Sequence, residues 1–370
     1  MNKVISIINA SRKNDGITIV ISRTASILKK MGYDVKWYQI LDRYTAKSLP
    51  DYDHLIPGVK TAPEIISMGI TRTRFVSKRF DINNKGLILI AEPTLINFMQ
   101  HPMTSIVRFH DFRAFTDYSD KFLTRLLYRM KIRKLRKTQY AIFSTEFVKK
   151  EAENHGITPK MSVTIKDKPR FNPEKGHLDL ALSHLKNGVI TITCISTDRP
   201  YKNLALFLEI AKELHKNDPE GYRFILVSKV GKELSKKIHS GNIIEVVEEV
   251  ADIKDIYNRT DILIVPSKYE GFCLPLVEAI YFGIPVVSFQ LPPFIEILGK
   301  YELFQNSDNP YIWAKSIEKL RDPFYYEQIS EFLINRAEAI EAENTEEKLR
   351  LFIDSIFEKT LSTSNKNHVI

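Results

Sequence analysis

Two glutamates, Glu270 and Glu278, stand eight residues apart in the part of this 370-residue chain whose residue types most clearly suggest chemistry. A buried apolar run at 261–266 leads through a loop into a helical pattern at 274–282. The first turn of such a helix offers backbone N–H groups without intrahelical partners, a setting that suits a phosphate group. Carboxylates accept hydrogen bonds from vicinal hydroxyls. The spacing therefore predicts a site for a ribose and a sugar that flank a diphosphate.

The elements that must position this site alternate along most of the chain, with short apolar runs between longer helical patterns. This alternation is typical of parallel sheets covered by helices on both faces. The apolar runs of the first half are 4–8, 35–38, 87–91, 105–109 and 140–144, and those of the second half are 189–195, 223–227, 243–247, 261–266 and 285–289. Ten strands in two groups of five predict an α/β protein with two doubly wound, Rossmann-like domains. Because ligands of open parallel sheets bind beyond the carboxyl ends of the strands, we expect the site where two such sheets face each other across a cleft.

The boundary between the domains is expected within 167–188, which is rich in helix and strand breakers and poor in periodicity. The predicted division is 1–172 for a first Rossmann-like domain and 173–322 for a second. From Pro323 the pattern is wholly helical, and residues 323–360 are predicted to return toward the first domain.

The motif around the two glutamates resembles that of a known enzyme family. Residues 270–278 read Glu-Gly-Phe-Cys-Leu-Pro-Leu-Val-Glu, and Gly-Ile-Pro-Val-Val follows at 283–287. This segment resembles the E-x7-E signature of retaining glycosyltransferases with the GT-B fold, similar to glycosyltransferase family 4. The resemblance implies a hexosyltransferase that moves a sugar from a nucleotide diphosphate sugar to an acceptor hydroxyl with retention of anomeric configuration. It also implies that 1–172 is the acceptor-side domain and that 173–322 is the nucleotide-sugar donor domain. It implies neither a metal nor another cofactor.

The resemblance also implies roles for single residues of the motif. Glu278 would bind the nucleotide ribose, and Glu270 would lie near the transferred sugar. The remaining donor-binding residues at the start of the helix would be Gly271, Phe272, Cys273 and Leu274. The family usually has glycine at the position of Cys273, so a side chain there would alter the space around the diphosphate.

A second loop, at 194–203, would supply the cations that close on the diphosphate. Lys202 matches the family's lysine, whereas the usual arginine is absent at 197 and Arg199 stands two positions further on. Two cations stabilise the charge of a leaving diphosphate without a metal. The alternative is that Arg199 and Lys202 belong to a solvated turn.

The resemblance is weaker in the first half. Gly16 opens the first helical pattern, where the family has a glycine-rich loop that contacts phosphate and acceptor. His110, in the Phe-His-Asp at 109–111, resembles the family's His-Asp and would lie beside the donor sugar. A single histidine at a strand end is more often structural, so this assignment depends on the family.

Positive charge is concentrated in the first half of the chain. The total is 54 basic and 45 acidic residues, but residues 1–180 hold 32 of the basic and 17 of the acidic ones. Residues 121–137 carry eight cations and no acid, with apolar residues at helical spacing. Two interpretations stay open: the helix lies on an anionic membrane surface, or its apolar face packs on the sheet while its cations face water. Nucleic acid is disfavoured because no aromatic-interleaved motif accompanies the helix.

Composition sets the remaining expectations. Two cysteines, Cys194 and Cys273, indicate a reducing compartment, and the sequence has no apolar run long enough to span a bilayer. We therefore expect a cytoplasmic protein, with a peripheral position at the inner face of the membrane if 121–137 binds lipid. Two alternative functions stay open. One is a nucleotide-sugar epimerase or hydrolase on the same scaffold, and the other is a non-catalytic basic protein that binds membrane or nucleic acid.

Overall fold

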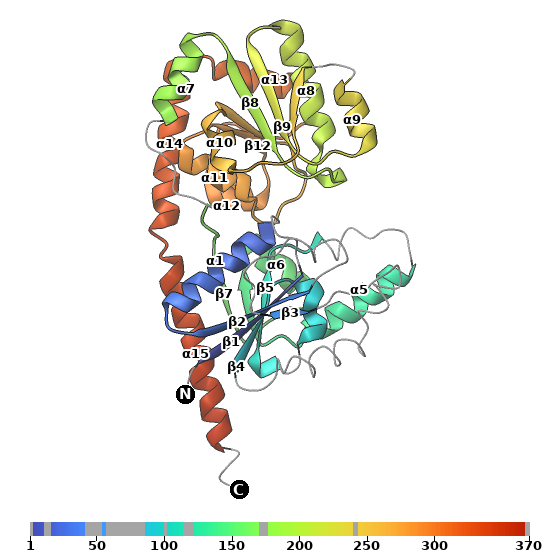
Figure 1. Ribbon diagram of the computed structural model, residues 1–370, viewed down its shortest axis with the longest axis vertical. Coiled ribbons are helices and arrows are strands. Elements are labelled where there is room, and N and C mark those ends of the chain that lie inside the picture. Colours follow the sequence, from blue (N-terminus) through green and yellow to red (C-terminus); the bar gives the residue numbers. More distant parts are fainter. Residues whose placement is uncertain are drawn as a thin grey trace. The chain divides into compact units, whose positions relative to one another are not determined.

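The protein forms two compact units in the computed structural model (Figure 1). The structure describes residues 3–10, 16–40, 54–56, 86–99, 102–113, 122–169, 177–239 and 243–366. Unit 1 comprises Met1–Asp167 and Asn344–Ile370, and unit 2 comprises Lys168–Glu343. The predicted boundary at 172/173 lies outside the described residues. Within the predicted C-terminal helical segment, α14 (Pro323–Glu341) belongs to unit 2 and α15 (Thr345–Lys366) belongs to unit 1.

The core of unit 1 is a seven-stranded parallel sheet in the order β3-β2-β1-β4-β5-β6-β7. Its strands are β1 (Val4–Asn9), β2 (Asp34–Ile40), β3 (His54–Ile56), β4 (Gly86–Ile90), β5 (Ser105–Phe109), β6 (Tyr140–Phe143) and β7 (Met161–Thr164). The order reverses between β1 and β4, which makes the carboxyl ends of these two strands the switch point of the sheet. Sequence analysis predicted five of the strands and missed β3 and β7, so the prediction of five strands per sheet was wrong.

Alternate residues of the strands of unit 1 face two separate hydrophobic cores. Ile5 and Ile7 pack with α1 (Gly16–Lys30) and α15, whereas Ile8 lies in the core on the opposite face. The opposite face is covered by η1 (Pro93–Phe98), α5 (Phe122–Leu135) and α6 (Glu146–Asn154), and η2 (Pro102–Thr104) precedes β5. Burial on both faces explains why these strands read as continuous apolar runs.

Unit 2 is built on a six-stranded parallel sheet in the order β10-β9-β8-β11-β12-β13. Its strands are β8 (Ile190–Ile195), β9 (Tyr222–Val227), β10 (Ile244–Val247), β11 (Ile262–Val265), β12 (Val286–Phe289) and β13 (Phe304–Gln305). Five of the six were predicted, and the two-residue β13 was missed. Here the order reverses between β8 and β11, so the loops that follow these strands meet at the switch point.

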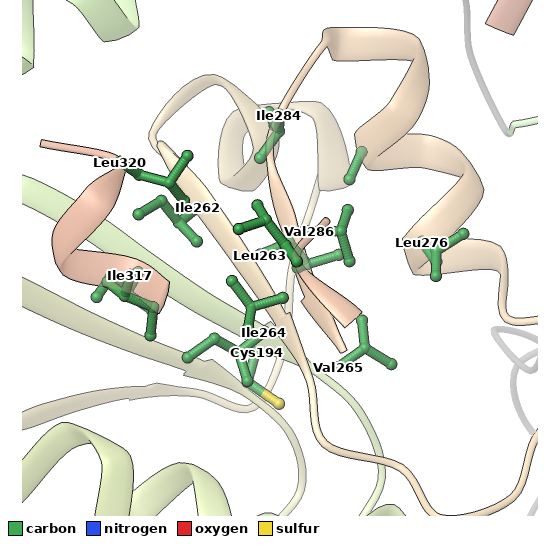
Figure 2. Close-up of a cluster of buried hydrophobic side chains, with 14 of the residues drawn as sticks. Cys194, Ile262, Leu263, Ile264, Val265, Leu276, Ile284, Val286, Ile317 and Leu320 are labelled. Atoms are coloured by element: carbon green, nitrogen blue, oxygen red, sulfur yellow. The ribbon is translucent and has the colours of Figure 1, made fainter. Parts of the chain in front are cut away.

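Helices cover both faces of the sheet of unit 2. They are α7 (His177–Lys186), η3 (Pro200–Lys202), α8 (Leu204–Asn217), α9 (Lys232–His239), α10 (Ile253–Asn258), α11 (Leu274–Phe282), α12 (Pro292–Leu298), α13 (Pro310–Lys319) and α14. Figure 2 shows side chains of β11 and β12 packed between Leu276 of α11 on one side and Ile317 of α13 on the other. This continuous core fixes the ends of β8 and β11, and with them the loops that carry the predicted site.

Candidate active site

Lys202 and Glu270 come together at the switch point of unit 2. Lys202 ends η3 in the loop after β8, and Glu270 lies in the loop between β11 and α11. The Nζ atom of Lys202 lies 2.6 Å from Oε1 of Glu270, and both side chains are largely buried. The sequence placed these residues on two separate loops, and the strand order makes them neighbours.

The ion pair determines the charge of Lys202. Burial by itself lowers the pKa of the ammonium group, but the Glu270 carboxylate raises that pKa above its usual value. Lys202 also lies over the ring of Tyr201, 5.3 Å from its centroid. The site therefore favours a protonated lysine next to a carboxylate.

Arg199 differs from Lys202 in its surroundings. It precedes η3, is exposed, and makes no side-chain hydrogen bond or ion pair within the part of the chain that the structure describes. Its backbone carbonyl accepts a hydrogen bond from the Lys202 N–H at 2.9 Å. The structure therefore brings Lys202 to Glu270 and leaves the Arg199 guanidinium in solvent beside them.

Glu278 lies deeper than the sequence suggested. It is fully buried in the second turn of α11, and its Oε2 accepts a hydrogen bond of 2.8 Å from the hydroxyl of Tyr257 on α10. Tyr257 is itself fully buried and stacks on Phe282. Tyr257 was not predicted from the sequence, because a single tyrosine on a six-residue helix carries no motif.

The start of α11 has an unusual backbone. Cys273 immediately precedes the helix with φ 75° and ψ 83°, in the left-handed region that non-glycine residues rarely adopt. Gly271 and Phe272 are buried before it, and Leu274 is the first helical residue. Burial, followed by the charge of Glu270, raises the pKa of the Cys273 thiol above its usual value. Glycine adopts this conformation without strain, which agrees with the glycine that the family resemblance implies at this position, and the raised pKa favours the protonated thiol.

The loops that hold Lys202 and Glu270 are joined by further contacts. The Lys268 N–H donates a hydrogen bond of 2.8 Å to the Tyr201 carbonyl. Asp308, in the loop before α13, accepts from Asn203 Nδ2 at 3.3 Å and pairs with Lys268 Nζ at 2.8 Å. Asp308 lies 38 residues beyond Glu270, and nothing in its sequence surroundings indicated that it would join the two loops.

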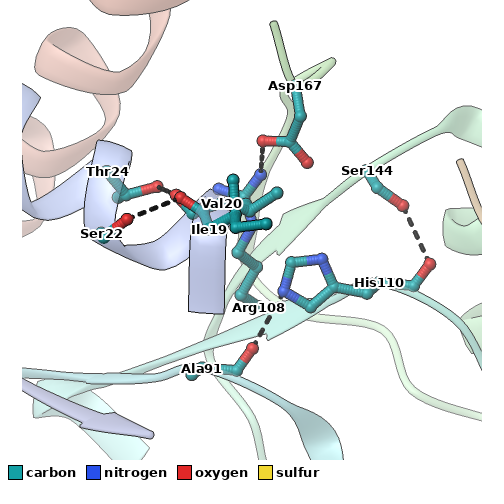
Figure 3. Close-up of polar contacts among 9 residues, drawn as sticks. All are labelled: Ile19, Val20, Ser22, Thr24, Ala91, Arg108, His110, Ser144 and Asp167. Atoms are coloured by element: carbon teal, nitrogen blue, oxygen red, sulfur yellow. Dashed lines mark hydrogen bonds and ion pairs between the residues drawn. The ribbon is translucent and has the colours of Figure 1, made fainter. Parts of the chain in front are cut away.

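His110 lies at the carboxyl edge of the sheet of unit 1 (Figure 3). Its Nε2 is 3.1 Å from the carbonyl of Ala91, which follows β4. Because a carbonyl oxygen only accepts, Nε2 carries the proton and Nδ1 is the acceptor. Burial, with the neighbouring Arg108 guanidinium as the second cause, lowers the pKa of His110 to about 3. His110 is therefore a neutral imidazole at physiological pH.

Two further residues of unit 1 are Gly16, which was predicted from the sequence, and Arg108, which was not. Gly16 is the exposed first residue of α1, two residues before Thr18, whose hydroxyl accepts a hydrogen bond from the Asn9 side chain at 3.0 Å. Arg108 forms a buried ion pair with Asp167, the last residue of this part of unit 1. The structure places Gly16 and His110 in unit 1 and the remaining predicted site residues in unit 2.

The ranges that the structure describes contain no group of three His, Cys, Asp or Glu side chains arranged to hold a metal ion. The expectation of a metal-free reaction stays a prediction.

Comparison with known proteins identifies the class to which this architecture belongs. Residues 182–332 match the family described as Glycosyl transferases group 1, a range that contains Lys202, Glu270 and Glu278. With the two parallel-sheet units and the site at the switch point, the match defines a glycosyltransferase of the GT-B fold. The matched range lies within unit 2, which spans Lys168–Glu343.

Curated and solved relatives agree with this class. The chain is 23% identical to the O-antigen chain mannosyltransferase RfbU of Salmonella typhimurium, over 65% of this chain and 67% of that protein. It matches the structure of HepE from Anabaena in complex with UDP and glucose with a TM-score of 0.71 and 14% identity, over 98% of this chain and 100% of HepE. The pneumococcal O-GlcNAc transferase GtfA, in complex with UDP and GlcNAc, matches with a TM-score of 0.70 and 14% identity over 96% and 99%. At these identities the structural matches show the GT-B fold alone.

Proposed function

We propose that this glycosyltransferase moves a hexose from a nucleoside diphosphate sugar to an acceptor hydroxyl with retention of anomeric configuration. The observation that carries the proposal is the Lys202–Glu270 ion pair, 2.6 Å long, at the switch point of unit 2. A protonated lysine there stabilises the negative charge that develops on a departing diphosphate. The structures of relatives in complex with UDP support a nucleoside diphosphate as the leaving group.

Each site residue has a role in this proposal. Lys202 binds the diphosphate, and Arg199, which is exposed, adds a second cation when the donor binds. The first-turn amides of α11 bind a phosphate oxygen. Glu270 orients Lys202 and accepts hydrogen bonds from the sugar. Glu278 accepts from the ribose, which requires a local opening because its carboxylate is fully buried.

Two residues of unit 1 complete the proposal. His110 is neutral with Nδ1 as its acceptor, so it accepts a hydrogen bond from a sugar hydroxyl but does not serve as a cationic acid. Gly16 offers its backbone N–H at the exposed start of α1.

The chemical step that we propose proceeds on one face of the sugar. The bond between the anomeric carbon and the diphosphate oxygen breaks, and the acceptor oxygen bonds to that carbon on the same face. The acceptor proton passes to the departing phosphate oxygen, so no protein base is required. Pairing with Lys202 supports a non-covalent role for Glu270, because an ion-paired carboxylate is a weaker nucleophile.

The acceptor in this proposal is a growing polysaccharide or a lipid-linked saccharide. Its support is the similarity to RfbU, whose name states that it is an O-antigen chain mannosyltransferase.

Product analysis by NMR tests this proposal. The enzyme is incubated with UDP-glucose, UDP-GlcNAc or GDP-mannose and a mixture of saccharide acceptors, and the anomeric configuration of the product is read from its proton coupling. We expect acceptor-dependent consumption of one donor and a product that keeps the donor's configuration. An inverted product contradicts retention. Rapid donor consumption without acceptor, or conversion of the sugar into its epimer, supports a hydrolase or epimerase and contradicts the transferase.

A further inference from the structure

Helix α5 turns only part of its apolar surface toward the core of unit 1. Ile132 and Leu135 are buried in that core, and Tyr128 packs against it. These three residues define the inner face of the helix, which lies against η1 at the periphery of the unit (Figure 1).

The opposite face of α5 carries a second apolar stripe. Leu126 and Met130, one helical turn apart, expose 45% and 47% of their surface. Arg129 and Arg133, also exposed, lie on the same side of the helix at the intervening positions. The sequence interpretation in which the whole apolar face packs on the sheet is therefore wrong for Leu126 and Met130. We call Leu126, Arg129, Met130 and Arg133 the outer face of α5.

The cations of α5 also differ between the inner and the outer face of the helix. Burial lowers the pKa of Lys131 and of Lys134, and Lys134 Nζ donates a hydrogen bond of 2.9 Å to the Asn97 carbonyl. Within the described part of the chain, by contrast, no acidic side chain pairs with Arg129 or Arg133. The sequence from 122 to 145 also contains no aspartate or glutamate. The outer face therefore joins exposed apolar side chains to uncompensated positive charge.

We propose that the outer face of α5 binds the surface of an anionic lipid bilayer. Leu126 and Met130 would enter the boundary between head groups and acyl chains, while Arg129 and Arg133 would contact lipid phosphates. A nucleic acid would match the charge but would leave the two apolar side chains in water, and none of the four residues that define the outer face is aromatic and able to stack on a base. None of the helices in the described ranges is long and apolar enough to cross a membrane, so binding would be interfacial. The proposal depends on neither the donor site nor the transferase reaction.

Flotation of the full chain with lipid vesicles tests the charge requirement. We expect the protein to float with vesicles that contain phosphatidylglycerol, to stay behind with phosphatidylcholine alone, and to lose binding as ionic strength rises. Each arginine is expected to raise the affinity for anionic vesicles about fivefold. The double variant Arg129→Gln with Arg133→Gln should therefore bind these vesicles about 25-fold more weakly. The matched control is Lys29→Gln with Lys30→Gln, which removes the same charge from exposed positions on α1 and should bind like wild type.

A second measurement tests insertion of the apolar stripe. A Leu126→Trp variant should shift its emission to shorter wavelength with anionic vesicles, and brominated lipids should quench it. Met130→Gln should weaken vesicle binding although it changes no charge. The proposal is overturned if wild type fails to float with anionic vesicles, or if the arginine variant binds them as well as the lysine control does. It is also overturned if anionic vesicles leave the emission of the Leu126→Trp variant unchanged while the protein binds an oligonucleotide.

Discussion

Lys202 Nζ lies 2.6 Å from Glu270 Oε1, although the two residues are 68 positions apart in the chain. The contact exists because β8 and β11 are neighbours in the sheet, so the loops that follow them share one edge. The lysine that the proposed mechanism needs is thus charged and oriented by the first glutamate of the motif.

The first prediction separates the structural role of this pair from its chemical role. Lys202→Met leaves Glu270 buried without its cation, and we expect a loss on the order of 3 kcal/mol in the free energy of unfolding. It also removes a charge from the leaving group, and turnover should fall about 100- to 1,000-fold. The double variant Lys202→Met with Glu270→Gln should recover most of the stability but none of the turnover. Denaturant titration and initial rates measure both. A double variant as unstable as Lys202→Met would show that the pair is not coupled.

A second prediction concerns the support of Glu278. Tyr257→Phe removes the hydroxyl that donates to Glu278 Oε2, so a buried carboxylate loses a hydrogen bond. We expect the free energy of unfolding to fall by about 1–2 kcal/mol and nucleotide affinity to fall several-fold, while turnover at saturating donor stays near that of wild type. Calorimetry and saturation kinetics distinguish these effects. The matched control is Tyr301→Phe, which removes the hydroxyl that accepts from the Val286 N–H in the same unit and should alter stability alone. Equal loss of affinity in both variants would contradict a specific role for Tyr257.

A third prediction follows from the backbone at Cys273. Glycine adopts its φ of 75° without strain, whereas a β-branched residue does so at a cost of about 1–3 kcal/mol. Cys273→Gly should therefore keep wild-type stability to within about 1 kcal/mol and retain donor binding. Cys273→Val should be markedly less stable and should bind donor more weakly, because the start of α11 shifts. Thermal unfolding with and without nucleotide measures both effects, and a Val variant as stable as the Gly variant would refute the argument.

The fourth prediction is a pH dependence that originates at His110. Its pKa is about 3 in the folded protein and about 6.5 in an unfolded chain, so the unfolded state takes up the proton first as pH falls. Stability that is fully present above the unfolded pKa is therefore lost as pH decreases toward the folded pKa. Between pH 8 and pH 5 the loss is about 2 kcal/mol.

His110→Asn removes this titration, so the stability difference between wild type and variant should shrink by that amount over the same interval. His177, whose pKa burial lowers to about 4, stays in both proteins and cancels in the comparison. A stability difference that is independent of pH would mean that His110 titrates normally.

Sequence patterns predicted those parts of the fold that have strong local signals. The apolar run at 105–109 coincides with β5 (Ser105–Phe109), and the pattern at 274–282 coincides with α11, because a continuous buried run and a helix with a glycine stop are both local features. The short β3 and β13, of three and two residues, leave no pattern of their own and form only through pairing with a neighbouring strand.

The sequence indicated candidate site residues but not the contacts between them. The motif indicated Glu270, Glu278 and Lys202, whereas the Tyr257–Glu278 hydrogen bond depends on how α10 packs on α11. Periodicity likewise placed Leu126 and Met130 on an apolar stripe of α5. It did not identify which of two stripes faces the core, because that choice depends on the packing of Ile132 and Leu135.

Calorimetric titration with UDP, GDP, ADP and CMP tests the central claim, that unit 2 binds a nucleoside diphosphate through the Lys202 loop and the two glutamates. Wild type and Glu278→Gln are titrated in parallel, and circular dichroism confirms that both are folded. We predict that wild type binds one of the diphosphates and that Glu278→Gln binds it at least about tenfold more weakly. No binding by wild type, or equal affinity in the two proteins, would contradict the assignment of the donor site.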